Sequence, residues 1–127
     1  MRAADTNLLV RLMVGDDLAQ TTAAEAFIEK GVWVSHLALA EAVWVLSKRY
    51  LFTPSKLVEV IELFLANVDV TLQDADVVAA ALEHFRNKPA LGFSDCLMLE
   101  IARKAGHLPL GTFDRKLARL PGAERVA

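Results

Sequence analysis

The sequence predicts an α/β fold, a three-layer α/β/α sandwich around a central, mostly parallel sheet. Short strand-like runs alternate with longer stretches of helical periodicity along the 127 residues. This alternation is typical of sheets whose strands run parallel and are joined by helices. No linker rich in Gly, Ser or Pro interrupts the pattern, so we expect residues 1–127 to form a single domain.

The first half of the chain is expected to begin with two strands, each followed by helices. The strands are predicted at 1–4 and 32–35, and the helices at 7–13, 21–29, 36–49 and 54–66. The start of the last helix is marked most clearly, because Thr53 can cap it and Pro54 suits the first helical position.

The second half continues the alternation. Residues 68–72 alternate apolar and polar side chains with period two, which predicts a strand with one covered face. The helix at 74–88 should stop before Pro89, and the helix at 94–105 should stop at Gly106. A strand at 108–112, a short helix at 114–120 and a terminal edge strand at 123–126 complete the prediction.

Composition excludes several classes of protein. Apolar residues make up 54% of the chain, and the 24% of charged residues are spread along it, which argues against both disorder and a membrane span. The first residues lack the features of a secretory signal, and the lone Cys96 cannot form an internal disulfide, so we expect a reducing, cytoplasmic setting. The net charge of −2 is mild evidence against a nucleic-acid partner.

Four carboxylates stand out from the other acids: Asp5, Glu41, Asp95 and Asp114. Glu41 interrupts the most apolar stretch of the chain and is predicted to lie on the core stripe of its helix. Its neighbours three and four residues away are Leu37, Ala38, Trp44 and Val45. An unpaired carboxylate in such a place costs at least several kcal/mol, so Glu41 is expected to need a cation.

The other three carboxylates have a simpler alternative. Asp95 and Asp114 precede apolar residues at helical spacing and are expected to face inward, but any Asp at a helix start can cap that helix or interact with its dipole. Taken singly, Asp5, Asp95 and Asp114 are better explained as caps than as ligands. Glu100, by contrast, has Arg103 and Lys104 at helical spacing and is expected in an ordinary salt-bridged surface environment.

Topology offers one explanation for all four acids. Residues just beyond the ends of parallel strands line one crevice, and each of the four lies shortly after a predicted strand or at the start of a crossover helix. Clustered oxygen ligands without Cys or His suit Mg²⁺ or Mn²⁺ better than zinc. The sequence therefore predicts a divalent metal site at one sheet edge.

Four segments carry a family resemblance. Asp5-Thr-Asn-Leu-Leu, Ser35-His-Leu-Ala-Leu-Ala-Glu41, Phe93-Ser-Asp95-Cys-Leu-Met-Leu and Gly111-Thr-Phe-Asp114 resemble, in order, the four acidic motifs of PIN-domain nucleases, and in particular the VapC-type toxin ribonucleases of toxin–antitoxin pairs. The resemblance covers the whole chain. It implies a PIN-like fold and an endoribonuclease whose four acids hold one or two Mg²⁺ or Mn²⁺ ions.

The resemblance also implies roles for other residues. Asn7 and Thr112 match polar residues that support the acids, and Gly92 departs from the family, since many relatives carry an Asp three residues before the acid that Asp95 matches. An RNA substrate, a small antitoxin partner and a homodimer are expected. A dimer would also cover an apolar excess predicted on two helices, at Trp44, Leu51, Phe52, Leu57, Ile61, Phe64 and Leu65.

Other functions fit the sequence less well. The three histidines show no zinc-binding spacing, and the serines lack the glycines of a nucleophile elbow. A phosphoacceptor receiver domain would need an early acidic pair in the site and a Lys at the end of a late strand, but Asp16-Asp17 is predicted as a turn. A catalytically idle PIN-like module that only binds a partner remains open because of Gly92.

Overall fold

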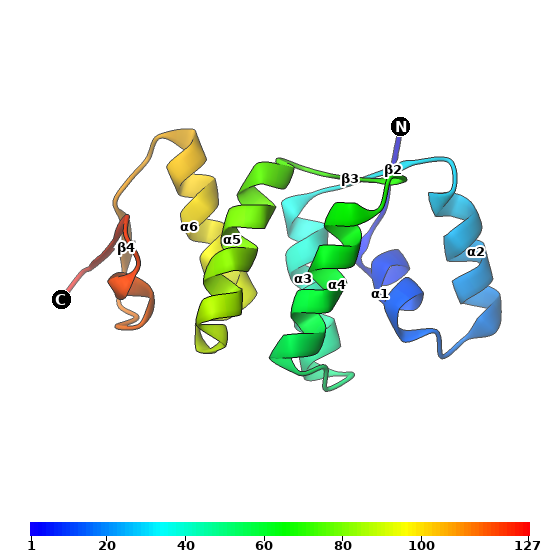
Figure 1. Ribbon diagram of the computed structural model, residues 1–127, viewed down its shortest axis with the longest axis horizontal. Helices are drawn as coiled ribbons and strands as arrows, with labels where there is room; N and C mark the ends of the chain where they lie inside the picture. The colour runs from blue at the N-terminus through cyan, green and yellow to red at the C-terminus, as the bar shows by residue number, and fades with distance from the viewer. The chain divides into compact units, whose positions relative to one another are not determined.

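The structure is a computed structural model that describes residues 1–127, and it divides into two compact units, Met1–Ala75 and Asp76–Ala127 (Figure 1). Helices alternate with parallel strands in both units, which confirms the predicted α/β class. The strands form two parallel sheets rather than one, because β4 (Leu110–Thr112) and β5 (Ala123–Arg125) in the second unit pair with each other. That the two units act as a single domain stays a prediction.

The first unit is built on a three-stranded parallel sheet in the order β1-β2-β3. Its elements are β1 (Arg2–Ala3), α1 (Thr6–Val14), α2 (Leu18–Ile28), β2 (Val32–Val34), α3 (His36–Lys48), α4 (Pro54–Ala66) and β3 (Val70–Leu72). Arg2 lies opposite Val32 and Val32 opposite Val70, so the strands end at the same edge. The chain passes from β1 into α1 and from β2 into α3 at that edge.

Side-chain caps set where four of these helices begin. Asp5, Asp17, Ser35 and Thr53 each accept a hydrogen bond from a backbone N–H three residues ahead. The cap at Asp17 explains why α2 starts at Leu18 and not at the predicted Thr21. The predicted start of α4 at Thr53 and Pro54 is confirmed.

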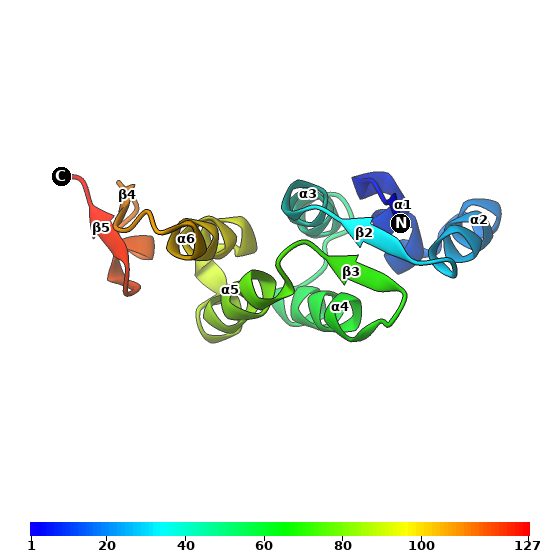
Figure 2. The same ribbon diagram turned by 90° about the horizontal axis from the view of Figure 1, so that it is seen from above.

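The helices of the first unit pack by their apolar faces. Helix α1 contacts both α2 and α3, while α4 packs on α3 and β3 (Figure 2). The side chains buried most completely come from α1, α3, α4 and the middle strand, and include Leu9, Leu39, Leu46, Ile61, Val32 and Val34. This core fixes α1 against α3, and the pocket described below lies between these two helices.

The second unit comprises most of α5 (Ala75–Asn87), then η1 (Pro89–Leu91), α6 (Phe93–Ala105), β4 (Leu110–Thr112), η2 (Leu117–Arg119) and β5 (Ala123–Arg125). Phe85 of α5 meets Phe93 of α6 edge to face, with ring centroids 6.1 Å apart. The helix predicted at 114–120 is a single 3₁₀ turn at 117–119. Its start is set by the Asp114 side chain, which accepts hydrogen bonds from two backbone N–H groups ahead of it.

None of the helices has both the length and the apolar character needed to cross a bilayer.

Candidate functional site

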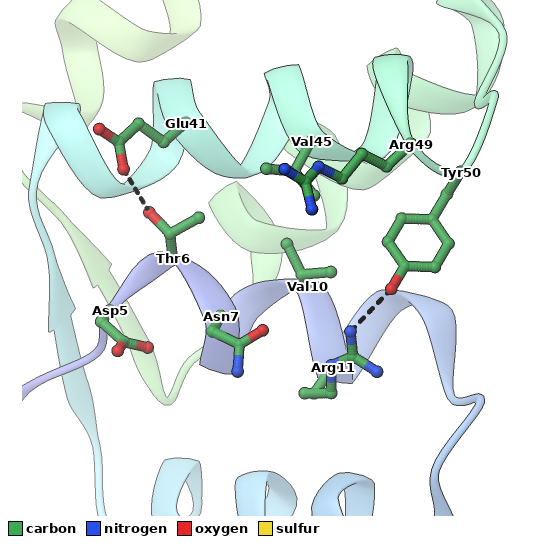
Figure 3. Close-up of a pocket in the computed structure, with 9 residues that line it drawn as sticks. All are labelled: Asp5, Thr6, Asn7, Val10, Arg11, Glu41, Val45, Arg49 and Tyr50. Carbon is green, nitrogen blue, oxygen red and sulfur yellow. Dashed lines mark hydrogen bonds between the residues drawn. The ribbon is translucent and has the colours of Figure 1, made fainter.

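Two of the predicted acids, Asp5 and Glu41, line one pocket in the first unit (Figure 3). The pocket has a volume of about 510 Å³ and lies between α1 and α3. The other lining residues are Thr6, Asn7, Val10, Arg11, Val45, Arg49 and Tyr50. The structure thus brings together the acid that follows β1 and the acid in the second turn of α3.

Asp5 serves as the N-cap of α1. Its Oδ1 accepts a hydrogen bond from the backbone N–H of Leu8 at 2.9 Å, which confirms capping as one role of this residue. Capping engages Oδ1 only. The side chain is exposed, so Asp5 can cap the helix and still offer an oxygen to the pocket.

Glu41 is exposed, and its predicted place on the core stripe of α3 is wrong. The buried face of α3 is formed by Ala38, Leu39, Ala42, Val43 and Leu46. Glu41 lies on another face, where Leu37 is 69% and Trp44 56% exposed. The error arose because the whole stretch is apolar, so spacing alone could not tell which apolar residues pack inward. Thr6 Oγ1 lies 3.3 Å from Glu41 Oε2 and 3.1 Å from the Ala38 carbonyl oxygen, and it can donate to either.

The opposite end of the pocket is basic. Arg11 donates to the Tyr50 hydroxyl at 2.7 Å and to Asp16. Its pKa is raised above the ordinary value, chiefly by the hydrogen bond with Tyr50; desolvation of the guanidinium opposes this, and the charge of Asp16 adds a smaller upward contribution. Arg49 forms no ion pair and points its guanidinium over Val45 (Figure 3). No pattern in the sequence indicated this basic end.

The other two predicted acids, Asp95 and Asp114, lie in the second unit, where the charge of Asp114 acts on Asp95. Asp95 lies in the first turn of α6 and is partly buried. Burial raises the pKa of Asp95 above its ordinary value, and the nearby charge of Asp114 raises it further. Two carboxylates that repel each other in this way favour a cation between them.

Asp114 is exposed, contrary to the prediction that it faces inward, while Leu117 three residues later is buried. Backbone N–H groups of Leu117 and Lys116 donate to its Oδ1 at 3.0 and 2.7 Å, and these bonds lower the pKa of Asp114 below its ordinary value. Asp114 therefore stays ionised and also caps the following turn.

Thr112 and Asn7, the residues expected to support the acids, each lie beside one of them. Thr112 Oγ1 accepts a hydrogen bond from the backbone N–H of Asp114 at 3.0 Å, so it orients the turn that carries the acid. Asn7 is exposed and lines the pocket beside Asp5. Gly92, at the N-terminus of α6, has a φ of 79°, a conformation that side chains other than glycine rarely adopt. The chain backbone is therefore adapted to glycine at this position.

The predicted ligands thus stand as two carboxylate pairs, one in each unit. No three His, Cys, Asp or Glu side chains in the structure form a group that could hold a metal ion. That both pairs converge on one site stays a prediction. The donor set fits Mg²⁺ or Mn²⁺, because every proposed donor is a carboxylate oxygen.

Cys96 and Glu100, two other titratable residues of the second unit, are both buried. Burial, with a smaller contribution from Asp95, raises the pKa of the Cys96 thiol to about 11, so this residue is a small apolar core group, as predicted. Glu100 is only 7% exposed, so its predicted surface environment is wrong. Its carboxylate lies 3.0 Å from His84 Nε2 and 3.1 Å from Arg103 Nε, and these partners compensate its burial.

The sequence matches a known protein family. No curated protein matches the sequence. The sequence profile of the family described as PIN domain matches residues 3–123, a span that includes all four acidic motifs and parts of both units. The chain therefore belongs to the PIN domain family, whose members are generally nucleases.

Proposed function

We propose that this protein is an Mg²⁺- or Mn²⁺-dependent endoribonuclease that hydrolyses phosphodiester bonds, and that it is the toxin of a toxin–antitoxin pair. Asp5, Glu41, Asp95 and Asp114 are the proposed metal ligands and catalytic residues. The observation that carries the proposal is the pairing of the acids in a PIN domain. Asp5 and Glu41 share one pocket, and the charge of Asp114 raises the pKa of Asp95.

Each acid has a separate task in this proposal. When bound, the divalent cation supplies Lewis acidity that activates water and stabilises charge on the phosphate oxygens. Asp5 and Asp95 are the proposed direct ligands, and Glu41 and Asp114 bind directly or through waters. Thr112 keeps Asp114 oriented through its backbone N–H, and Thr6 holds Glu41 toward α1.

The pocket in the first unit also supports a polyanionic substrate. Its acidic end suits a metal ion, and the exposed Arg49 at its other end is a cation without an ion-pair partner. An RNA strand needs both features, because its reacting phosphate binds the metal while a neighbouring phosphate binds a guanidinium. The overall charge of −2 does not oppose this, since the charges are separated within the pocket.

The proposed partners are an antitoxin and a second copy of the chain. Of the apolar residues predicted to be in excess, Leu57, Ile61 and Phe64 are buried within the first unit. Trp44 and Leu51 are 56% and 81% exposed and remain available for a partner. The toxin assignment rests on the resemblance of the motifs.

Two experiments test the proposal. Purified protein should cleave single-stranded RNA with Mg²⁺ or Mn²⁺, lose activity in EDTA and recover when the metal is restored. Expression of the lone chain should arrest growth, and expression of the native operon should relieve the arrest and yield a small co-purifying protein. Harmless expression with no small partner would overturn the toxin role, and RNA cleavage that persists in EDTA would overturn the metal-dependent mechanism.

A second candidate function is a catalytically idle PIN module that binds a partner. The observation that favours it is Gly92, whose φ of 79° disfavours the Asp that many relatives carry at this position. Complete absence of cleavage with either metal, combined with a stable protein complex from the native operon, would select this alternative.

A further inference from the structure

A second concave site lies in the second unit, where η1 faces the turn around η2. It has a volume of about 300 Å³. Its lining residues are Lys88, Pro89, Ala90, Leu91, Lys116 and Arg119, which we call the cationic pocket. Three of the six are cations and none is an acid, which distinguishes this site from the pocket that holds Asp5 and Glu41.

The charges of the cationic pocket are not neutralised by salt bridges. Elsewhere in the second unit, Arg86 pairs with Glu83 and Lys104 with Asp76. Lys88, Lys116 and Arg119 are not in such pairs, and Lys88 and Arg119 are exposed. Three like charges around one hollow repel each other and create a local positive potential that an anion would relieve.

The pocket joins the segments that carry Asp95 and Asp114. Pro89–Leu91 forms η1, which leads through Gly92 into α6 and its first-turn acid. Lys116 follows Asp114 by two residues, and its charge contributes to the lowered pKa of that acid. A chain of phosphates held by the pocket would therefore lie close to the acid pair.

The other three lining residues, Pro89, Ala90 and Leu91, are apolar, so the pocket combines apolar and cationic side chains. A nucleotide has the same division, since its phosphates are anionic and its sugar and base present apolar faces. A lone inorganic anion would bind the cations and leave these apolar residues uncovered. The arrangement therefore favours a nucleic-acid strand over a free phosphate ion.

We propose that the cationic pocket binds the phosphodiester backbone of the single-stranded RNA substrate on one side of the phosphate to be cleaved. This inference rests on the proposed ribonuclease function, and it adds where the strand is held. The metal site would bind the reacting phosphate, and the phosphates of adjacent nucleotides would contact Lys88, Lys116 and Arg119.

The proposal is tested by the salt dependence of RNA binding, measured under conditions in which the RNA is not cleaved. The full chain is titrated in EDTA with a fluorescently labelled single-stranded RNA of mixed sequence, and anisotropy gives the binding constant at several KCl concentrations. Each phosphate contact on a single strand contributes about 0.7 to the slope of log K against log salt. The double variant Lys88→Gln/Arg119→Gln should therefore lower the slope by about 1.4 and weaken binding at low salt.

The matched control is Arg115→Gln/Arg125→Gln, which removes two exposed cations of the same unit that do not line the pocket. It makes the same change in net charge and should leave the slope within error of the unsubstituted protein. Thermal unfolding of both double variants checks that each one folds.

The outcomes separate the alternatives. The proposal would be overturned if the two double variants had equal slopes of log K against log salt. The cations of the pocket would then contribute to RNA binding only through the net charge of the protein. Binding of inorganic phosphate that Lys88→Gln/Arg119→Gln abolishes, together with an RNA slope that this variant leaves unchanged, would assign the pocket to a free phosphate ion and would also overturn the proposal. Pocket-dependent RNA binding by a protein that never cleaves RNA with Mg²⁺ or Mn²⁺ would support the pocket while refuting the proposed function.

Discussion

Replacing Asp5 should separate its capping role from its proposed metal role. Asn retains an oxygen that can accept from the Leu8 N–H, so Asp5→Asn should unfold at nearly the same temperature as the unsubstituted protein. Ala removes the acceptor, which costs about 1 kcal/mol. For a chain of this length that corresponds to a fall of roughly 4 °C in Tm. Both variants lose the carboxylate and should lose RNA cleavage.

The chain provides a matched control at Asp17. This residue caps α2 in the same way, accepting from the Gln20 N–H at 3.1 Å, and it does not line the pocket. Asp17→Ala should lower Tm by a similar amount while RNA cleavage is unchanged. Tm is measured by circular dichroism and cleavage with a labelled RNA in Mn²⁺. Full activity in Asp5→Asn would refute the reasoning, as would lost activity in Asp17→Ala.

Three further predictions address the second unit and the assembly. Because the pKa of Asp95 is raised in the folded state, its ionisation opposes folding, so Asp95→Asn should be more stable than the unsubstituted protein near pH 7. Denaturant titrations should show this gain shrink as pH falls through the raised folded-state pKa and vanish below the ordinary pKa of about 3.9. Glu100→Ala should lower the free energy of unfolding by about 2 kcal/mol, because the buried carboxylate bonds His84 and Arg103, and equal urea midpoints would contradict this. Sedimentation at micromolar concentration should show a dimer that Trp44→Ser weakens, and a 13.9 kDa monomer alone would exclude it.

Sequence predicted the elements well, because their boundaries are local. Thr53 with Pro54 and the glycine at 106 act within a few residues of the helix ends that they mark, and the structure bears both out. Thr112, which was expected to support the acids, accepts a hydrogen bond from the backbone N–H of Asp114, and its part in a metal site stays a prediction.

Burial within the apolar helix α3 could not be predicted. Both Trp44 and Leu46 are apolar, yet only Leu46 faces the core, so the choice of face depends on packing against other elements. The burial of Glu100 could not be predicted for the same reason, because its partner His84 lies on a different helix. The basic end of the pocket also escaped notice, since Arg11 and Arg49 are 38 positions apart in sequence.

The most direct test of the account is whether Asp5 and Asp95 act on the same metal. Calorimetric titration with Mn²⁺ of the unsubstituted protein, Asp5→Asn, Asp95→Asn and the double variant gives a double-mutant cycle. If the four carboxylates share a site, each single variant should weaken binding, and the double variant should lose much less binding free energy than the sum of the two single losses. Strict additivity, or Mn²⁺ binding unchanged in either single variant, would contradict the shared site.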